Sequence, residues 1–197
     1  MKRILLAAFA ITAATLASCT SDSNNNQQDA ATTNPEEQTT SAASDTTLTE
    51  DKKELMQTIA QHTLLEIELG KLAVAKGSTD NVKQYGQQAI DNYTKQLNEL
   101  QEIARGYKVD LNVTLEDTYR KYAEDLGKKQ GVEFDKEYWK NVTDAQKKAL
   151  NAYEKQLKDV TEADGTAFGI WARTSEKELR ARYEQALAHQ LELKNRT

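Results

Sequence analysis

The side chains best suited to chemistry in this sequence are two histidines, a single cysteine and a glutamate close to one of the histidines. His62 and Glu66 have the i,i+4 spacing that places two side chains on one face of a helix, where both can ligate a metal ion. Ferritin-type sites also need carboxylates and Glu-x-x-His pairs from several helices, which these two residues do not supply. We therefore expect a structural or half-exposed His62 and no bound metal or cofactor, with metal binding by His62 and Glu66 as the alternative.

No catalytic motif accompanies these residues. The sequence has no phosphate-binding glycine loop, no Ser-x-x-Lys element and no His-Glu-x-x-His element. His189 is expected to be a solvated residue near the end of the last helix, where a charged imidazole favours the helix dipole. We therefore predict no catalytic residues and a protein that is not an enzyme.

Cys19 follows a short apolar leader. Lys2 and Arg3 precede an apolar stretch of about 13 residues, which is typical of a secretory signal and too short for a membrane span of about 20 residues. The tetrapeptide Leu16-Ala17-Ser18-Cys19 resembles the lipobox of bacterial lipoproteins. This resemblance implies a signal peptide over residues 1–18 and lipid attachment at Cys19, with an ordinary signal peptide as the alternative.

Residues 19–46 are almost entirely polar or small and include the one proline. Such a segment cannot bury enough apolar surface to offset its ordering entropy, so we predict a disordered, lipidated tether. We expect a location in the cell envelope, at the outer membrane, through the N-terminal lipid. The net charge of −5 and the lack of a basic stripe make nucleic acid and anionic lipid poor partners.

From Thr47 onward the sequence has no proline and few glycines, which is typical of one all-helical domain over residues 47–197. Apolar residues recur at helical spacing in four segments that end at Gly77, at Gly106, at the Asp164-Gly165 pair and near the C-terminus. The first helix is expected to open with a capping box from Thr47 to Glu50 and to end at Gly77. The second is expected to be capped by residues 78–80, and the third to open at Asp135.

Four amphipathic helices, each about 40 Å long, favour an all-α four-helix bundle. The first and last connections are tight, so each predicts an antiparallel hairpin. The middle connection, residues 107–134, is long enough to cross the bundle. It contains a predicted short helix that is capped by residues 114–117 and runs through about Leu126. We therefore expect a ferritin-like arrangement with one long crossover rather than a simple up-down-up-down bundle.

Three stretches resemble a bacterial family of secreted and lipid-anchored domains of unknown function with a ferritin-like fold. They are residues 66–73 (Glu-Ile-Glu-Leu-Gly-Lys-Leu-Ala), 81–86 (Asn-Val-Lys-Gln-Tyr-Gly) and 134–138 (Phe-Asp-Lys-Glu-Tyr). The resemblance covers roughly residues 50–193 and implies no established reaction. The family pattern places candidate metal-ligating histidines where this chain has Tyr93, Gln146 and Arg182, and only Glu66 of that set is retained.

Glu66, Tyr93, Gln146 and Arg182 are predicted to share one height in a crossover bundle, and we call these four residues the polar layer. A buried guanidinium needs a partner, and Glu66 is the natural one for Arg182. The four groups can satisfy one another as a closed network without an ion. Alternatively, Arg182 reaches solvent and Glu66 is a surface acid.

Aromatic residues cluster in and after the middle connection: Tyr119, Tyr122, Phe134, Tyr138 and Trp139. They are expected to pack the connection onto the bundle, with a shallow ligand pocket as the alternative. Together these features predict a lipid-anchored envelope protein that is structural or binds a protein partner. The alternatives are a metal-binding ferritin-like protein and a carrier of a small apolar ligand.

Overall fold

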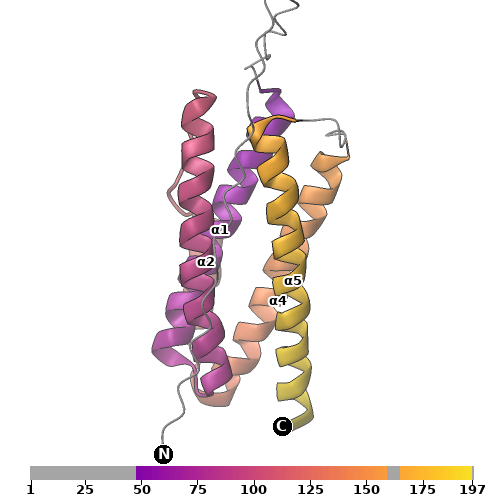
Figure 1. Ribbon diagram of the computed structural model, residues 1–197. Helices are drawn as coiled ribbons and strands as arrows, with labels where there is room; N and C mark the ends of the chain where they lie inside the picture. Colours follow the sequence, from indigo (N-terminus) through magenta and orange to yellow (C-terminus); the bar gives the residue numbers. More distant parts are fainter. Residues whose placement is uncertain (1–47, 159–164, 197) are drawn as a thin grey trace, which may run out of the picture. The chain divides into compact units, whose positions relative to one another are not determined.

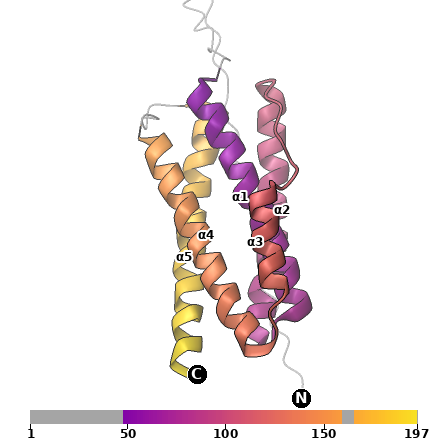
Figure 2. The same cartoon turned by 180° about the vertical axis from the view of Figure 1, so that it is seen from behind.

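A computed structural model describes residues 48–158 and 165–196, and these residues form five helices. The helices are α1 (Glu50–Lys76), α2 (Asp80–Gly106), α3 (Asp117–Gly127), α4 (Gly131–Leu157) and α5 (Ala167–Arg196) (Figure 1; α3 is seen in Figure 2). The all-α prediction is confirmed, and the helices pack as a bundle in which α3 is the short helix expected in the middle connection. The predicted signal peptide over residues 1–18, Cys19 and the tether over residues 19–46 lie outside the described residues.

Two hairpins make up the bundle. Helix α1 packs most extensively on α2, and α4 packs on α5. Contact between α1 and α4 joins the hairpins, whereas α2 and α5 touch only sparsely. The seam between α2 and α5 is therefore the most loosely closed side of the bundle.

The middle connection runs along α1 and returns the chain to the end of the bundle where α4 begins (Figure 2). Near the start of α1, the side-chain amides of Gln57 and Gln61 each donate to the backbone oxygen of Asn112, over 3.1 Å. At the end of α1, the Lys76 ammonium donates to the backbone oxygen of Gly127. The connection is thus a crossover held by side chains of α1, as its length predicted.

Small residues bring α1 and α2 into close contact. A Cβ atom at Gly70 would lie 2.7 Å from the backbone oxygen of Gly86, and one at Gly86 would lie 2.6 Å from the Ala73 Cβ. Both distances are below van der Waals contact, so any larger side chain would push the helices apart.

The helix ends differ in detail from the predictions. Helix α1 has Thr49 as its N-cap, and the Thr49 hydroxyl accepts from the backbone N–H of Lys52 over 3.4 Å. Gly77 ends α1 as expected, but its φ of −53° is not left-handed. A glycine is required there because a Cβ would lie 2.6 Å from the backbone oxygen of Ala73. Helix α3 begins at Asp117 with Glu116 as its N-cap, both within the predicted cap of residues 114–117.

Asp135 caps α2 rather than opening α4. Its carboxylate accepts from the Ser78 N–H over 2.8 Å, from the Ser78 hydroxyl over 2.7 Å and from the Thr79 N–H over 3.0 Å. Asp135 is fully buried (0 % exposed), and α4 starts four residues earlier, at Gly131. The N-cap of α2 is Thr79, within the predicted residues 78–80, but Thr79 makes no side-chain cap bond. The capping acid comes from another helix.

The core has two main apolar clusters along the bundle, one around Leu55, Leu100 and Phe168 and one around Leu69, Val82 and Phe134. Polar residues occupy the middle of each long helix, between these two clusters.

None of the helices within residues 48–158 and 165–196 combines the length and the apolar character that a membrane span requires.

Candidate functional site

Glu66 lies in the middle of α1 with no exposed surface (0 %), so it is not the surface acid of the alternative prediction. Neither carboxylate oxygen has a hydrogen-bond partner among the described residues. The nearest charged or polar contact is His62, one helical turn earlier, whose Nε2 lies 3.4 Å from Glu66 Oε1. His62 is itself buried and its Nε2 makes no hydrogen bond in the described part of the chain.

Gln146 of α4 links the polar layer to two tyrosines of α2. Its amide nitrogen donates to the Tyr85 hydroxyl over 3.0 Å and to the Tyr93 hydroxyl over 3.3 Å. Tyr85 donates in turn to the backbone oxygen of Arg182, over 3.2 Å, and so connects α2 to α5. Both amide hydrogens of Gln146 are therefore used, while its carbonyl oxygen has no partner within the described ranges.

The tyrosines around Glu66 are held in their protonated form. Burial, followed by the charge of the Glu66 carboxylate, raises the pKa of Tyr85, Tyr93 and Tyr138 well above the ordinary value. These three phenols therefore stay protonated, and each keeps an O–H group that can donate a hydrogen bond. The Tyr138 hydroxyl has no partner among the described residues.

Arg182 does not pair with Glu66, contrary to the expected ion pair. Its guanidinium bonds to Glu178, one turn earlier on α5, over 2.9 Å. It also lies over the Tyr93 ring, 4.9 Å from the ring centroid, at a distance typical of cation–π contact. The Arg182 side chain is 17 % exposed. Because α2 and α5 touch only sparsely, its guanidinium reaches Glu178 at the surface of the bundle.

The polar layer is therefore open rather than a closed network. Gln146 contacts Tyr93, and Arg182 contacts Tyr93, but Glu66 meets His62 instead of the other members. Histidine, cysteine and acidic side chains do not form any group of three suited to a metal in the described residues. A cation here would need amide or hydroxyl oxygens as further ligands.

The aromatic cluster packs the core rather than lining a pocket of its own. Phe134, Tyr138 and Trp139 are almost fully buried, while Tyr119 and Tyr122 pack partly buried against them. Burial raises the pKa of Tyr122 to about 12.

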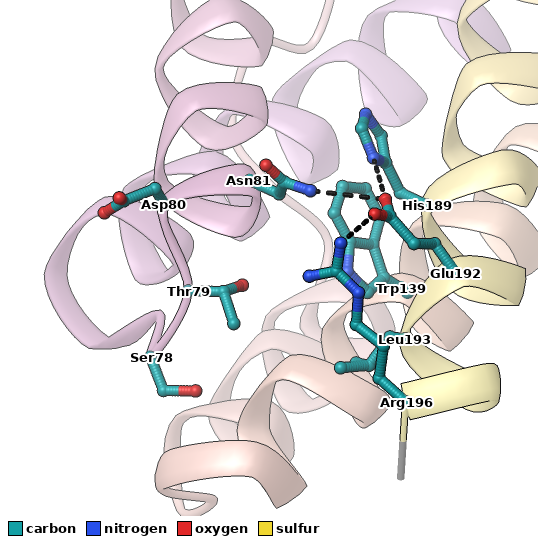
Figure 3. Close-up of a pocket in the computed structure, with 9 residues that line it drawn as sticks. All are labelled: Ser78, Thr79, Asp80, Asn81, Trp139, His189, Glu192, Leu193 and Arg196. Atoms are coloured by element: carbon teal, nitrogen blue, oxygen red, sulfur yellow. Dashed lines mark hydrogen bonds and ion pairs between the residues drawn. The ribbon is translucent and has the colours of Figure 1, made fainter.

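A polar pocket of 360 Å³ lies between the start of α2 and the end of α5 (Figure 3). Glu192 projects into it, accepting from the Asn81 amide over 3.4 Å and pairing with Arg196. His189 stacks on the Trp139 ring with a centroid distance of 4.9 Å and is 27 % exposed in its side chain. The expectation of a solvated His189 is corrected, because the indole covers one face of the imidazole.

An apolar groove of 810 Å³ lies on the outer face of α4 and α5. We call it the lysine-rimmed groove, and its lining residues are Lys136, Trp139, Lys140, Leu187, Gln190, Leu191, Leu193 and Lys194. Leu187 and Leu191 are 38 % and 59 % exposed, and none of the lining residues is acidic. This surface was not predicted from the sequence, although the i,i+4 pair Leu187 and Leu191 lies off the buried stripe of α5 and signals it.

Comparison with known proteins adds a family but no activity. No curated protein and no solved structure matches the sequence. The model of a domain of unknown function, DUF4142, matches residues 37–188. This match spans most of the chain and all but the last turns of the bundle, and the chain therefore belongs to the DUF4142 family.

Proposed function

We propose that this protein is a lipid-anchored, non-enzymatic domain of the cell envelope that docks a partner protein through the lysine-rimmed groove. The observation that carries the proposal is the exposure of Leu187 and Leu191 beside three lysines in a chain with a net charge of −5. Exposed apolar surface with a charged rim is typical of interaction sites.

The occupant that fits this groove is an acidic amphipathic helix. Its apolar face would cover Leu187, Leu191 and the edge of Trp139, and its carboxylates would meet Lys136 and Lys194. Lys140 already contacts Glu137 at 3.5 Å and Asp144 at 3.6 Å, so it offers less free charge. The remaining positive charge is small for binding an anionic lipid surface, which needs clustered lysines and arginines.

The anchor and the fold type belong to the same proposal. The lipobox-like residues 16–19 support attachment to a membrane through Cys19. The crossover connection between two helical hairpins supports a ferritin-like bundle. The absence of catalytic motifs from the sequence supports a binding role.

The test places a photo-crosslinking amino acid at position 191 of the full chain in its native cell. Position 170 is the matched control, because Ile170 is 53 % exposed near the other end of α5. The expected result is one protein adduct specific to position 191, whose purified acidic segment binds the wild-type chain. Lys136→Glu with Lys194→Glu should weaken that binding at least about tenfold, and lysine substitutions in the segment should restore it.

Three results would count against docking of an acidic helix. They are equal crosslinking at positions 170 and 191, adducts only to lipid, and adducts only to a second copy of this chain.

A further inference from the structure

A fully buried carboxylate without hydrogen bonds is costly, and Glu66 is such a group. Arg182 does not pair with it: its Nη2 bonds to Glu178 and its guanidinium lies over the Tyr93 ring, while its Nη1 is buried without a partner among the described residues. His62 alone lies near, and its contact does not satisfy either carboxylate oxygen.

The side chains of His62 and Glu66 lie close together. Their atoms Nε2 and Oε1 are 3.4 Å apart, yet neither atom makes a hydrogen bond among the described residues. Two ligands that bind one tetrahedral ion at about 2.1 Å each are separated by about 3.4 Å. The pair therefore has the separation of two ligands on a common metal ion.

A further buried acceptor lies beside the same tyrosine ring. The carbonyl oxygen of Gln146 has no partner among the described residues, and its amide nitrogen donates to the Tyr93 hydroxyl over 3.3 Å. The Tyr93 ring in turn lies edge-on to His62, with ring centroids 5.7 Å apart. A cation satisfies several oxygen acceptors at once, which a single donor cannot do.

We propose that His62 and Glu66 bind one divalent first-row cation in the core of the bundle, with the Gln146 carbonyl oxygen as a third ligand. Mixed imidazole and oxygen ligands at tetrahedral separation suit Zn²⁺. The site uses His62 of this chain and needs no histidine at positions 93, 146 or 182.

The test is zinc titration of the chelator-treated full chain in detergent, followed by calorimetry. Cobalt is added in parallel, because its absorption bands report tetrahedral coordination. Wild type should bind one equivalent, and His62→Gln and Glu66→Gln should each weaken binding at least about tenfold. Glu68→Gln is the matched acidic control, since Glu68 is half-exposed on the same helix, and His189→Gln is the control for the other histidine.

Circular dichroism of each variant checks that the helices are intact. The proposal is wrong if folded wild type binds no zinc, or if folded His62→Gln and Glu66→Gln bind it as tightly as wild type. It is also wrong if His189→Gln abolishes binding while His62→Gln keeps it. That result would place the ion at His189 and Glu192, whose Nδ1 and Oε2 atoms are 3.8 Å apart.

Discussion

Glu66 lies in the middle of α1 and Arg182 in the middle of α5, two helices that do not pack against each other, and the two residues form no ion pair. In a double-mutant cycle, Glu66→Gln and Arg182→Met should therefore change the free energy of unfolding additively, within about 0.3–0.5 kcal/mol. The partner of Arg182 is Glu178, on its own helix, at 2.9 Å. Urea unfolding of the two single variants and the double variant measures these free energies. A coupling of about 1 kcal/mol or more between Glu66 and Arg182 would show that they do form the expected ion pair.

The buried tyrosines make stability sensitive to alkali. The folded state raises the pKa of Tyr85, Tyr93 and Tyr138, whereas the unfolded chain loses these protons near the ordinary tyrosine pKa of about 10. The folded state then holds more protons, so the free energy of unfolding should fall as the pH rises above about 10. Each such tyrosine contributes up to about 1.4 kcal/mol per pH unit.

Tyr138→Phe isolates one of these groups, because it keeps the buried ring and removes a hydroxyl that has no partner in the described chain. The decline of stability above pH 10 should become shallower in this variant, as measured by urea unfolding across the alkaline range. An unchanged slope would show that Tyr138 ionises equally in the folded and unfolded states.

At the scale of elements, one acid joins three of the five helices. Asp135 of α4 accepts three hydrogen bonds from the turn between α1 and α2. Asp135→Ala should destabilise the protein by about 2–4 kcal/mol, because it leaves two backbone N–H groups at a helix start without their acceptor. Thermal or urea unfolding measures the change.

Asp144→Ala is the control for this substitution, since Asp144 is 59 % exposed on the same helix and should cost no more than about 0.5 kcal/mol. Equal effects of the two alanine substitutions would contradict the assignment of Asp135 as the cap of α2.

At the scale of the whole molecule, the proposed anchor and the helical bundle are separable. Because acylation needs the Cys19 sulfur, Cys19→Ala should abolish fatty-acid labelling and release the protein from membranes or leave it unprocessed. The bundle should keep its helical circular dichroism, since its core lies within residues 48–196. Membrane retention of a cleaved, unlabelled variant would count against the lipoprotein proposal.

The sequence by itself determined the all-α class, the four long helices and the short helix of the crossover. Those features depend on neighbours three or four residues apart and on the length of the connections, and both can be read along the chain. It also identified Glu66, Tyr93, Gln146 and Arg182 as interior polar positions, because each falls on or beside an apolar stripe.

Only the tertiary structure decided which of these groups meet. In the sequence, Asp135 looks like the first residue of a helix. Its role as the cap of α2 depends on the contact of α4 with the turn at Ser78, which lies 57 residues earlier in the sequence. Arg182 pairs with Glu178 along its own helix, and Glu66 faces His62 at i,i+4, because α1 and α5 do not pack against each other. Pairing between helices depends on interhelical distances and on long side-chain rotamers, which periodicity within one helix does not specify.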